Sequence, residues 1–319
     1  MKISVIGCGR WGTFIAWYLD KIGHQVILYG RETSRNMEML KKTRTNGTIT
    51  LSETINLECN IENVLKSDVI VISISSQGLR ELLGQVAQFS PENKCFVLCM
   101  KGIEISTNKR LSEVAEEYIG KDNSVAVWLG PGHVEDYYQG IPNCMVIDSK
   151  SEQTKKKLVD MFSSELIRFY YGSDLIGNEI GAAAKNVIGI GAGMLDGLKL
   201  TPLKGALMAR GTHEVAHLIK ALGGDEISAY GLCHLGDYEA TVFSEHSHNR
   251  KFGESVVNGI EYNQLAEGYY TAQALHNLSE LYAVDMPICN AIYNILYKKA
   301  VPEETIKHLF LRTLKREFA

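Results

Sequence analysis

Short apolar runs alternate with helical segments in the first half of the chain. The run KISVI (2–6) ends in glycines, as a buried parallel strand does before a tight turn, and segment 12–22 and the run QVILY (25–29) follow as a helix and a second strand. A strand, a glycine-rich turn, a helix and a strand within about 30 residues form a βαβ unit. Further strands are predicted at 69–74, 95–100, 125–129, 144–148 and 166–170, and further helices at 78–88 and 109–119. The first half therefore predicts a doubly wound α/β domain.

The pattern changes after about residue 175. Residues 175–197 are apolar and rich in Ala and Gly, which indicates a buried helix that other backbone approaches closely. Helical periodicity then dominates 203–222, 263–284 and 286–299. We predict an α/β architecture in which a Rossmann-type doubly wound sheet (1–174) is followed by a mostly α-helical C-terminal domain (175–319).

Composition narrows the class of protein. The 319 residues favour about two domains of roughly 150 residues each. A net charge of −4 gives no bulk basicity, so nucleic acid is not an expected partner. No run of about 18 apolar residues occurs, so no membrane span is predicted. The seven cysteines are scattered without a CxxC pair and are typical of reduced thiols, and we expect a cytoplasmic protein.

The turn after the first strand reads GCGRWG (7–12) and matches GxGxxG directly between a strand and a helix. In this setting the first glycine makes the tight turn, the second lets the backbone approach a pyrophosphate, and the third lets the helix pack on the strand. The free N–H groups at the start of the helix face the anion. We therefore predict that a dinucleotide is bound by Gly7, Gly9, Arg10, Trp11 and Gly12.

The choice between NAD and NADP depends on the end of the second strand. NAD enzymes usually carry an acidic residue there for the ribose hydroxyl, whereas this strand runs into Gly30-Arg31-Glu32. The guanidinium of Arg31 could pair with a 2′-phosphate, which favours NADP. Stacking on adenine or simple exposure to solvent is the alternative. We expect NAD or NADP as the cofactor, with Arg31 among its contacts.

Further short stretches recur in a fixed order along the chain. They are SSQGLRELL (75–83), MKGIE (100–104), GPGHVEDYYQGIPN (130–143), GAAAKNVIGIGAG (181–193), ARG (209–211), LGDYEAT (235–241), SHNRKFG (247–253), AEGYYTAQAL (266–275) and VDMPICNAIY (284–293). With the glycine-rich loop they make nearly the whole chain resemble the NAD(P)-dependent sn-glycerol-3-phosphate dehydrogenase family. The resemblance implies reversible reduction of dihydroxyacetone phosphate to glycerol 3-phosphate, with hydride from the nicotinamide.

A single charge interrupts the apolar helix predicted at 175–197. Lys185 is the only charged residue between Glu179 and Asp196, and an ammonium isolated there needs partners or a function. Burial lowers the pKa of a lysine, so its ammonium can polarise a carbonyl and then donate its proton. The resemblance implies that Lys185 is the catalytic lysine and that Asn186 hydrogen-bonds the substrate. A lysine that extends to the surface is the alternative.

Other residues join the site through the resemblance. Lys101 follows the strand 95–100, at the carboxyl edge where α/β sheets bind ligands, and matches a second substrate lysine. Asp237 and Thr241 match residues beside the catalytic lysine, where a carboxylate would stabilise the charged ammonium. A solvated lysine and a turn aspartate are the alternatives.

The resemblance also implies two sets of contacts. The substrate contacts are Lys101, Gly130, Gly132, Ser247, His248 and Asn249. The cofactor contacts, besides those of the glycine-rich loop and Arg31, are Lys101, Val134, His248 and Glu267.

Three positions depart from the family pattern. His248 stands where the resembled family has the arginine that binds the substrate phosphate, and an imidazole is shorter than a guanidinium and only partly charged at pH 7. The family's Gly-Pro-Ser-Phe-Ala reads GPGHV (130–134), so a serine hydroxyl is missing at Gly132 and a histidine follows it. Arg10 stands where serine is common and adds charge near the pyrophosphate. A related polyol or hydroxy substrate, with a different or absent phosphate, is therefore an alternative.

Two other classes of function compete. The motif HEVAH (213–217) has the spacing with which His213 and His217 hold zinc on a helix, with Glu214 as general base. The same segment has a clear apolar stripe, so an amphipathic helix without metal is the favoured interpretation. A non-enzymatic NAD(P) sensor need not keep Lys185. We expect no metal, a small-molecule substrate, and a homodimer because dimers are the commonest soluble oligomers.

Overall fold

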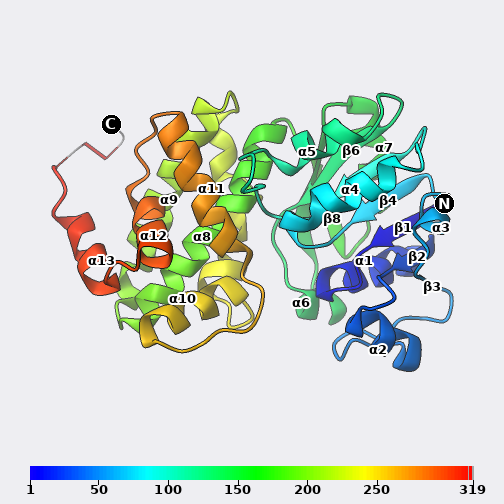
Figure 1. Ribbon diagram of the computed structural model, residues 1–319, viewed down its shortest axis with the longest axis horizontal. Helices are drawn as coiled ribbons and strands as arrows, with labels where there is room; N and C mark the ends of the chain where they lie inside the picture. Colours follow the sequence, from blue (N-terminus) through cyan, green and yellow to red (C-terminus); the bar gives the residue numbers. More distant parts are fainter. Residues whose placement is uncertain (315, 318–319) are drawn as a thin grey trace.

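The computed structural model describes residues 1–314 and 316–317, with a sheet in the first half of the chain and a helical bundle in the second (Figure 1). The strands are β1 (Lys2–Ile6), β2 (Gln25–Tyr29), β3 (Asn56–Glu58), β4 (Val69–Ile72), β5 (Cys95–Leu98), β6 (Ser124–Leu129), β7 (Asn143–Ser149) and β8 (Ile167–Tyr171). They form one sheet in the order β3-β2-β1-β4-β5-β6-β7-β8, in which β6 and β7 are the antiparallel pair and the other neighbours are parallel. The first six positions follow the Rossmann order, so the predicted doubly wound sheet is confirmed.

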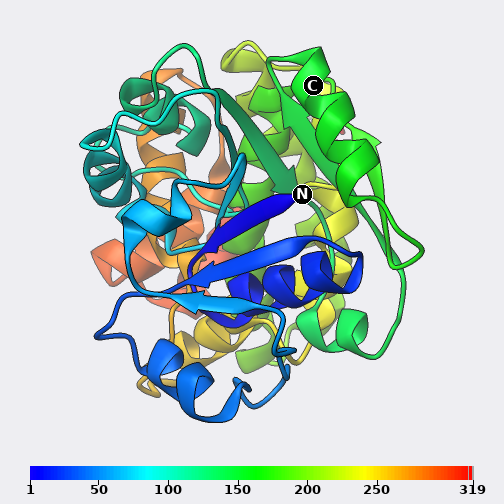
Figure 2. The same ribbon diagram turned by 90° about the vertical axis from the view of Figure 1, so that its right-hand side faces the viewer.

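Helices cover both faces of this sheet (Figure 2). They are α1 (Arg10–Lys21), α2 (Arg35–Thr43), α3 (Ile61–Val64), α4 (Leu79–Ala87), α5 (Leu111–Tyr118), α6 (Val134–Tyr138) and α7 (Glu152–Phe162). In β4, Val69 and Val71 pack in the apolar cluster that includes α1 and α7, while Ile70 and Ile72 pack in the cluster that includes α4 and α5. A strand buried on both faces needs an unbroken apolar run, which is the pattern seen in the sequence.

The second half is built around one buried helix (Figure 1). Its helices are α8 (Leu175–Gly197), α9 (Lys204–Ala221), α10 (His248–Asn258), α11 (Glu267–Leu281), α12 (Pro287–Lys298) and α13 (Pro302–Phe310). Every residue of α8 from Glu179 to Leu195 is buried, and α9, α10, α11 and α12 pack against this helix. The predicted mostly helical second half is confirmed.

Two glycines let α8 and α10 touch through their backbones. A Cβ atom on Gly193 would lie 1.8 Å from the carbonyl oxygen of Arg250, and one on Gly253 would lie 2.0 Å from that of Ile190. Neither position can therefore carry a side chain without moving one helix. The close backbone approach expected from the Gly-rich sequence of α8 is confirmed.

Several elements were absent from the sequence predictions. The strand β3 has three residues and the helix α6 has five, too few for a periodic pattern to show. In the helix α10, Gly253 and Ser255 are buried, and Phe252, Val256 and Val257 pack partly buried against the apolar core of the second half. The glycine contacts with α8 add to this packing.

A short connection joins the two halves of the fold. The last strand ends at Tyr171 and α8 begins at Leu175; the predicted boundary between 174 and 175 falls in this connection and stays a prediction. The buried carboxylate of Glu179 in α8 accepts hydrogen bonds from Arg110 Nη1 at 2.6 Å and from the backbone N–H of Ser112 at 2.9 Å. These bonds tie α8 to the start of α5. Within the described part of the chain, no helix combines the length and apolarity that crossing a bilayer requires.

Candidate active site

The glycine-rich loop between β1 and α1 has the geometry that a pyrophosphate site requires. A Cβ atom on Gly7 (φ +115°) would lie 2.0 Å from the carbonyl oxygen of Ser73, and one on Gly12 would lie 1.8 Å from that of Gly7. At Gly9, by contrast, an added Cβ would meet nothing within 4 Å. Two glycines therefore allow close packing, and the third leaves open space in front of the first amides of α1. This is the cradle in which a dinucleotide phosphate fits.

The side chains around this loop are held by α6. The guanidinium of Arg10 forms an ion pair with Glu135, which lies 125 residues further along the chain. The ring of Trp11 packs against Phe14 and Tyr137, with centroids 5.0 and 6.3 Å away. The predicted positive charge at Arg10 is thus already partnered, and the predicted contact of Trp11 with the cofactor would use the part of the ring that this packing leaves uncovered.

The remaining predicted cofactor residues lie at the same edge of the sheet. Arg31 is exposed just beyond the end of β2. The side chain of Val134 is buried, so the backbone N–H at the start of α6 is the group it offers to a ligand. Glu267 accepts a hydrogen bond of 3.1 Å from the backbone N–H of Ser76 and a second from its hydroxyl. It links the start of α11 to the turn that follows β4.

Two lysines meet at one buried carboxylate. Lys101, just beyond β5, donates from Nζ to Asp237 Oδ2 at 2.6 Å and to the carbonyl oxygen of Gly130 at 2.6 Å. Lys185 lies in α8, and its Nζ is 3.0 Å from the same Asp237 oxygen and 2.7 Å from Thr241 Oγ1. The structure thus brings together four residues from three distant parts of the sequence.

Burial sets the proton affinity of Lys185. Only 8% of the residue is exposed, and burial is the main cause that lowers the pKa of its ammonium to about 8. The charge of Asp237 raises this pKa, and the neighbouring Lys101 lowers it. The second oxygen of the carboxylate, Asp237 Oδ1, is buried and has no hydrogen-bond partner among the described residues. A lysine in this state exchanges its proton near neutral pH.

A chain of amides runs from Lys101 to α11. Asn186 donates to the carbonyl oxygen of Lys101 at 3.1 Å and accepts from Asn249 at 3.0 Å. Asn249 in turn accepts from the backbone N–H of Gly268 at 2.9 Å. The chain holds α8, α10 and α11 around the lysine pair. Ser247 caps the start of α10 by accepting from the N–H of Arg250, so it contributes to this helix start.

The imidazole of His248 has a partner of its own. Its Nδ1 is hydrogen-bonded to the hydroxyl of Tyr262 at 2.8 Å. Burial lowers the pKa of His248, and the positive charges of Arg10 and Lys251 lower it further. The ring is therefore largely neutral at pH 7, so it cannot supply the permanent charge of an arginine. Its role as a ligand contact stays a prediction.

The turn GPGH after β6 explains one departure and adds a residue that the sequence analysis missed. A Cβ atom on Gly132 (φ +134°) would lie 2.3 Å from Cε2 of Tyr137, so this backbone leaves no room for a serine. The next residue, His133, belongs to the turn whose Gly130 carbonyl oxygen accepts a hydrogen bond of 2.6 Å from Lys101 Nζ, and burial, followed by the charge of Lys185, lowers the pKa of its imidazole. The signal was present as a histidine beside a missing hydroxyl, but only the fold places this turn beside Lys101.

Two family profiles match the two halves of this chain. The profile described as NAD-dependent glycerol-3-phosphate dehydrogenase N-terminus matches residues 2–155, and the one described as its C-terminus matches residues 174–307. The chain belongs to the NAD-dependent glycerol-3-phosphate dehydrogenase family. It is 36% identical over 329 residues to a glycerol-3-phosphate dehydrogenase (NAD(P)+) of Thermoanaerobacter sp. (strain X514), covering 99% of both chains. The match to that of Thermotoga sp. (strain RQ2) is 34%, covering 100% of this chain and 99% of the relative.

A solved structure agrees with this membership. The crystal structure of glycerol-3-phosphate dehydrogenase from Coxiella burnetii superposes with a TM-score of 0.92 at 26% sequence identity, covering 98% of this chain and 99% of the other. The Rossmann-type half and the helical half are thus both shared with that member of the glycerol-3-phosphate dehydrogenase family.

The HEVAH motif has a structural task in this family member. The buried carboxylate of Glu214 accepts from the backbone N–H groups of Ile288 at 2.8 Å and Cys289 at 3.2 Å, and so caps the start of α12. Burial raises the pKa of Glu214 to about 8. Among the residues that the structure describes, no cluster of three or more His, Cys, Asp or Glu side chains is arranged to hold a metal ion. The zinc alternative has no support in this geometry.

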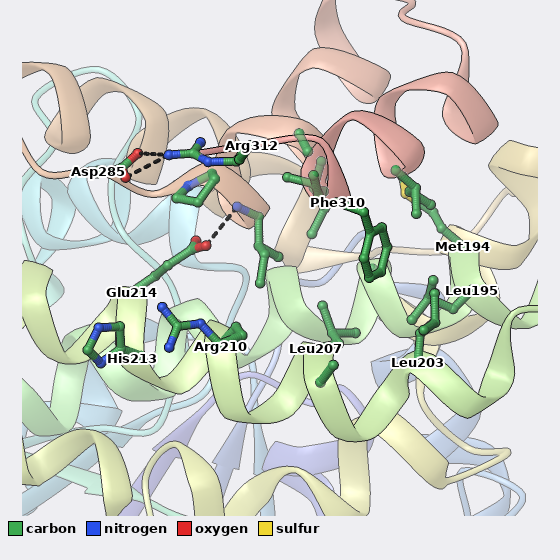
Figure 3. A pocket seen from close by; sticks show the side chains of 18 of the residues that line it. Met194, Leu195, Leu203, Leu207, Arg210, His213, Glu214, Asp285, Phe310 and Arg312 are labelled. Atoms are coloured by element: carbon green, nitrogen blue, oxygen red, sulfur yellow. Dashed lines mark hydrogen bonds and ion pairs between the residues drawn. The ribbon is translucent and has the colours of Figure 1, made fainter. Parts of the chain in front are cut away.

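This motif also borders a cavity of about 540 Å³ between α8, α9, α12 and α13. Figure 3 shows Arg210, His213 and Glu214 near one end of it and the apolar side chains of Leu207 and Phe310 toward the other. Lys101 and Lys185 do not line this cavity, although α8 contributes to both places. The cavity is therefore separate from the candidate site around Asp237.

Proposed function

We propose that this chain catalyses the reversible, NAD(P)-dependent reduction of dihydroxyacetone phosphate to sn-glycerol 3-phosphate. The observation that carries the proposal is the buried Lys185, whose pKa is about 8 and whose Nζ is held between Asp237 and Thr241. Full-length relatives that are named glycerol-3-phosphate dehydrogenase (NAD(P)+) support the same activity. A protein that only sensed nucleotides would have no need of a proton donor in this state.

The residues of the chain divide the chemistry between them. The bound dinucleotide supplies or accepts the hydride. In reduction, the ammonium of Lys185 polarises the substrate carbonyl and then gives its proton to the developing alkoxide oxygen. Asp237 stabilises this ammonium before the transfer, and Thr241 fixes the direction of Nζ. In oxidation, the neutral amine of Lys185 takes the hydroxyl proton.

The second lysine and the amide chain position the substrate. Lys101 carries a positive charge at the carboxyl edge of β5, within reach of the same carboxylate as Lys185. We assign Lys101, Asn186 and Asn249 to substrate binding because one chain of hydrogen bonds links the three residues beside Lys185. Gly130, Gly132, Ser247 and His248 remain proposed substrate contacts.

We propose that either NAD or NADP serves as cofactor, held by the glycine-rich loop. The open space at Gly9 and the free amides of α1 support phosphate binding there. The exposed guanidinium of Arg31 supports an interaction with the 2′-phosphate of NADP. We further propose a homodimer and a cytoplasmic location; the latter is supported by seven cysteines that are all free thiols.

Steady-state kinetics test the function. Wild-type protein should oxidise NADH or NADPH when dihydroxyacetone phosphate is added, and much more slowly with dihydroxyacetone, which lacks the phosphate. Lys185→Ala should reduce turnover by about 10²- to 10⁴-fold or more, because it removes the proton donor. The same variant should keep its affinity for NADPH in a fluorescence titration. No turnover by wild type at millimolar substrate, with nucleotide binding intact, would refute the proposal.

A further inference from the structure

His133 carries a buried nitrogen that nothing in the free protein satisfies. It directly precedes α6, at the end of the GPGH turn. Its Nε2 atom is enclosed, and no described residue supplies a hydrogen-bond partner for it. A buried polar atom without a partner costs about 1–3 kcal/mol, so such an atom needs an explanation. Beside a candidate reaction site, the most direct explanation is a bound ligand that supplies the missing hydrogen-bond partner.

Charged groups on several elements face this imidazole. Burial is the main cause that lowers its pKa; Lys185 on α8, Arg10 on α1 and the neighbouring His246 also lower it, while Asp136 on α6 raises it. The rings of His133 and His246 lie 5.8 Å apart. Basic groups thus lower the pKa of His133 in the free protein, and Arg10 among them is already paired with Glu135. An anion bound to His133 would favour the protonated imidazole.

No other side chain of the turn can take this place. The carbonyl oxygen of Gly130 is occupied by Lys101, and Pro131 presents its carbonyl oxygen to the hydroxyl of Tyr137. Gly132 has no side chain, and the ring of Tyr137 prevents one. His133 is therefore the polar side chain that the turn offers to the lysine pair.

We propose that His133 binds the substrate, with its Nε2 donating a hydrogen bond to an oxygen of the substrate phosphate. This inference rests on the proposed function. It assigns to His133 the polar contact that Gly132 cannot make, next to the carbonyl that Lys185 polarises. Because Nε2 is enclosed, the substrate reaches it only with a rotation of the ring or a small shift of the turn 130–133. His133 is then a specificity-determining residue for phosphorylated substrates.

Kinetics of three variants test this role. His133→Phe keeps a ring of similar shape without the donor and should raise the KM for dihydroxyacetone phosphate about tenfold, with the KM for NADPH changed less than about twofold. His133→Gln keeps an N–H donor and should recover most of this loss. His246→Phe is the matched control, because it removes the neighbouring exposed imidazole, and it should change the KM for the substrate less than about threefold.

Each outcome has one meaning. An unchanged KM in His133→Phe, or an equal rise for substrate and NADPH, shows that the residue is only structural and overturns the inference while the proposed function stands. Failure of His133→Gln to recover any loss does the same. Wild-type protein without turnover overturns the proposed function and this inference together. Should His133→Phe lose its cooperative thermal transition, His133→Gln and His133→Asn decide, since Asn keeps a donor on a shorter arm and should give an intermediate KM.

Discussion

Lys185 Nζ lies 3.0 Å from Asp237 Oδ2, and this buried ion pair raises the pKa of the lysine that we propose as proton donor. The same carboxylate oxygen is 2.6 Å from Lys101 Nζ, so one negative charge is shared by two ammonium groups. Because the carboxylate is shared, it stabilises the ammonium of Lys185 less than a carboxylate paired with Lys185 alone would. Together with burial, it accounts for a pKa near 8 instead of 10.5.

The rate of ketone reduction should fall as the pH rises through about 8, because the reaction then loses the protonated form of Lys185. The rate of alcohol oxidation should rise over the same range, since it needs the neutral amine. Profiles of kcat against pH in both directions measure this. A matching fall in both directions would assign the titration to another group.

Asp237→Asn should lower the pH at which the reduction rate falls by about one unit or more. The carboxylate raises the pKa of Lys185, and its loss leaves two lysines facing each other. The rate at pH 7.5 should fall, while activity at lower pH should partly recover. A variant with lower activity at every pH and an unmoved limb would show that Asp237 acts through geometry alone.

Arg31→Ala should distinguish the two cofactors. Loss of the exposed guanidinium beyond β2 should raise the KM for NADPH about tenfold, as expected for a charge-assisted contact with a 2′-phosphate, and should leave the KM for NADH nearly unchanged. Parallel titrations with both nucleotides provide the measurement. Equal effects on both would assign Arg31 to the adenine or to solvent.

Gly132→Ser should not restore a missing hydroxyl. Its Cβ would lie 2.3 Å from the Tyr137 ring at φ +134°, so overpacking and backbone strain together should lower the free energy of unfolding by about 2–4 kcal/mol. Gly140→Ser is the control: it has φ +87° and nothing within 4 Å, so strain alone should cost about 1–2 kcal/mol. Thermal melts should rank the variants in this order, and equal losses would mean that Tyr137 moves freely.

Glu214→Ala should lower the free energy of unfolding by about 2 kcal/mol, because it leaves the first amides of α12 without their acceptor. His217→Ala, on the same helix, should cost less than about 1 kcal/mol and leave turnover unchanged. Chemical denaturation compares the two. Activity that depends on added zinc, or is lost in His217→Ala, would revive the metal interpretation.

The central strands could be predicted because they are buried on both faces. The runs at β1, β2 and β4 are mostly apolar, and each strand end that was expected lies within two residues of the observed one. The glycine-rich loop could be predicted because Gly7, Gly9 and Gly12 each meet a different steric requirement. The lysine pair was reached through resemblance and through the isolation of Lys185 in an apolar helix.

What the sequence could not show depends on contacts between distant segments. Arg10 and Glu135 are 125 residues apart, and nothing local marks them as partners. The orientation of His133 depends on a turn whose shape is fixed by Tyr137. The capping role of Glu214 exists only once α12 has docked. Packing of the folded chain decides such pairings, and the local periodicity of the sequence carries no information about them.

The close approach of Gly193 to Arg250 and of Gly253 to Ile190 sets the distance between α8 and α10, and this distance has a consequence for the candidate site. Both helices carry site residues near this crossing: Lys185 and Asn186 on one, His248 and Asn249 on the other. A single methyl group at either glycine would force the two helices apart and move the start of α10. Every residue of the site would stay chemically unchanged. The spacing of the candidate site residues is thus set by backbone contacts that lie outside the site itself.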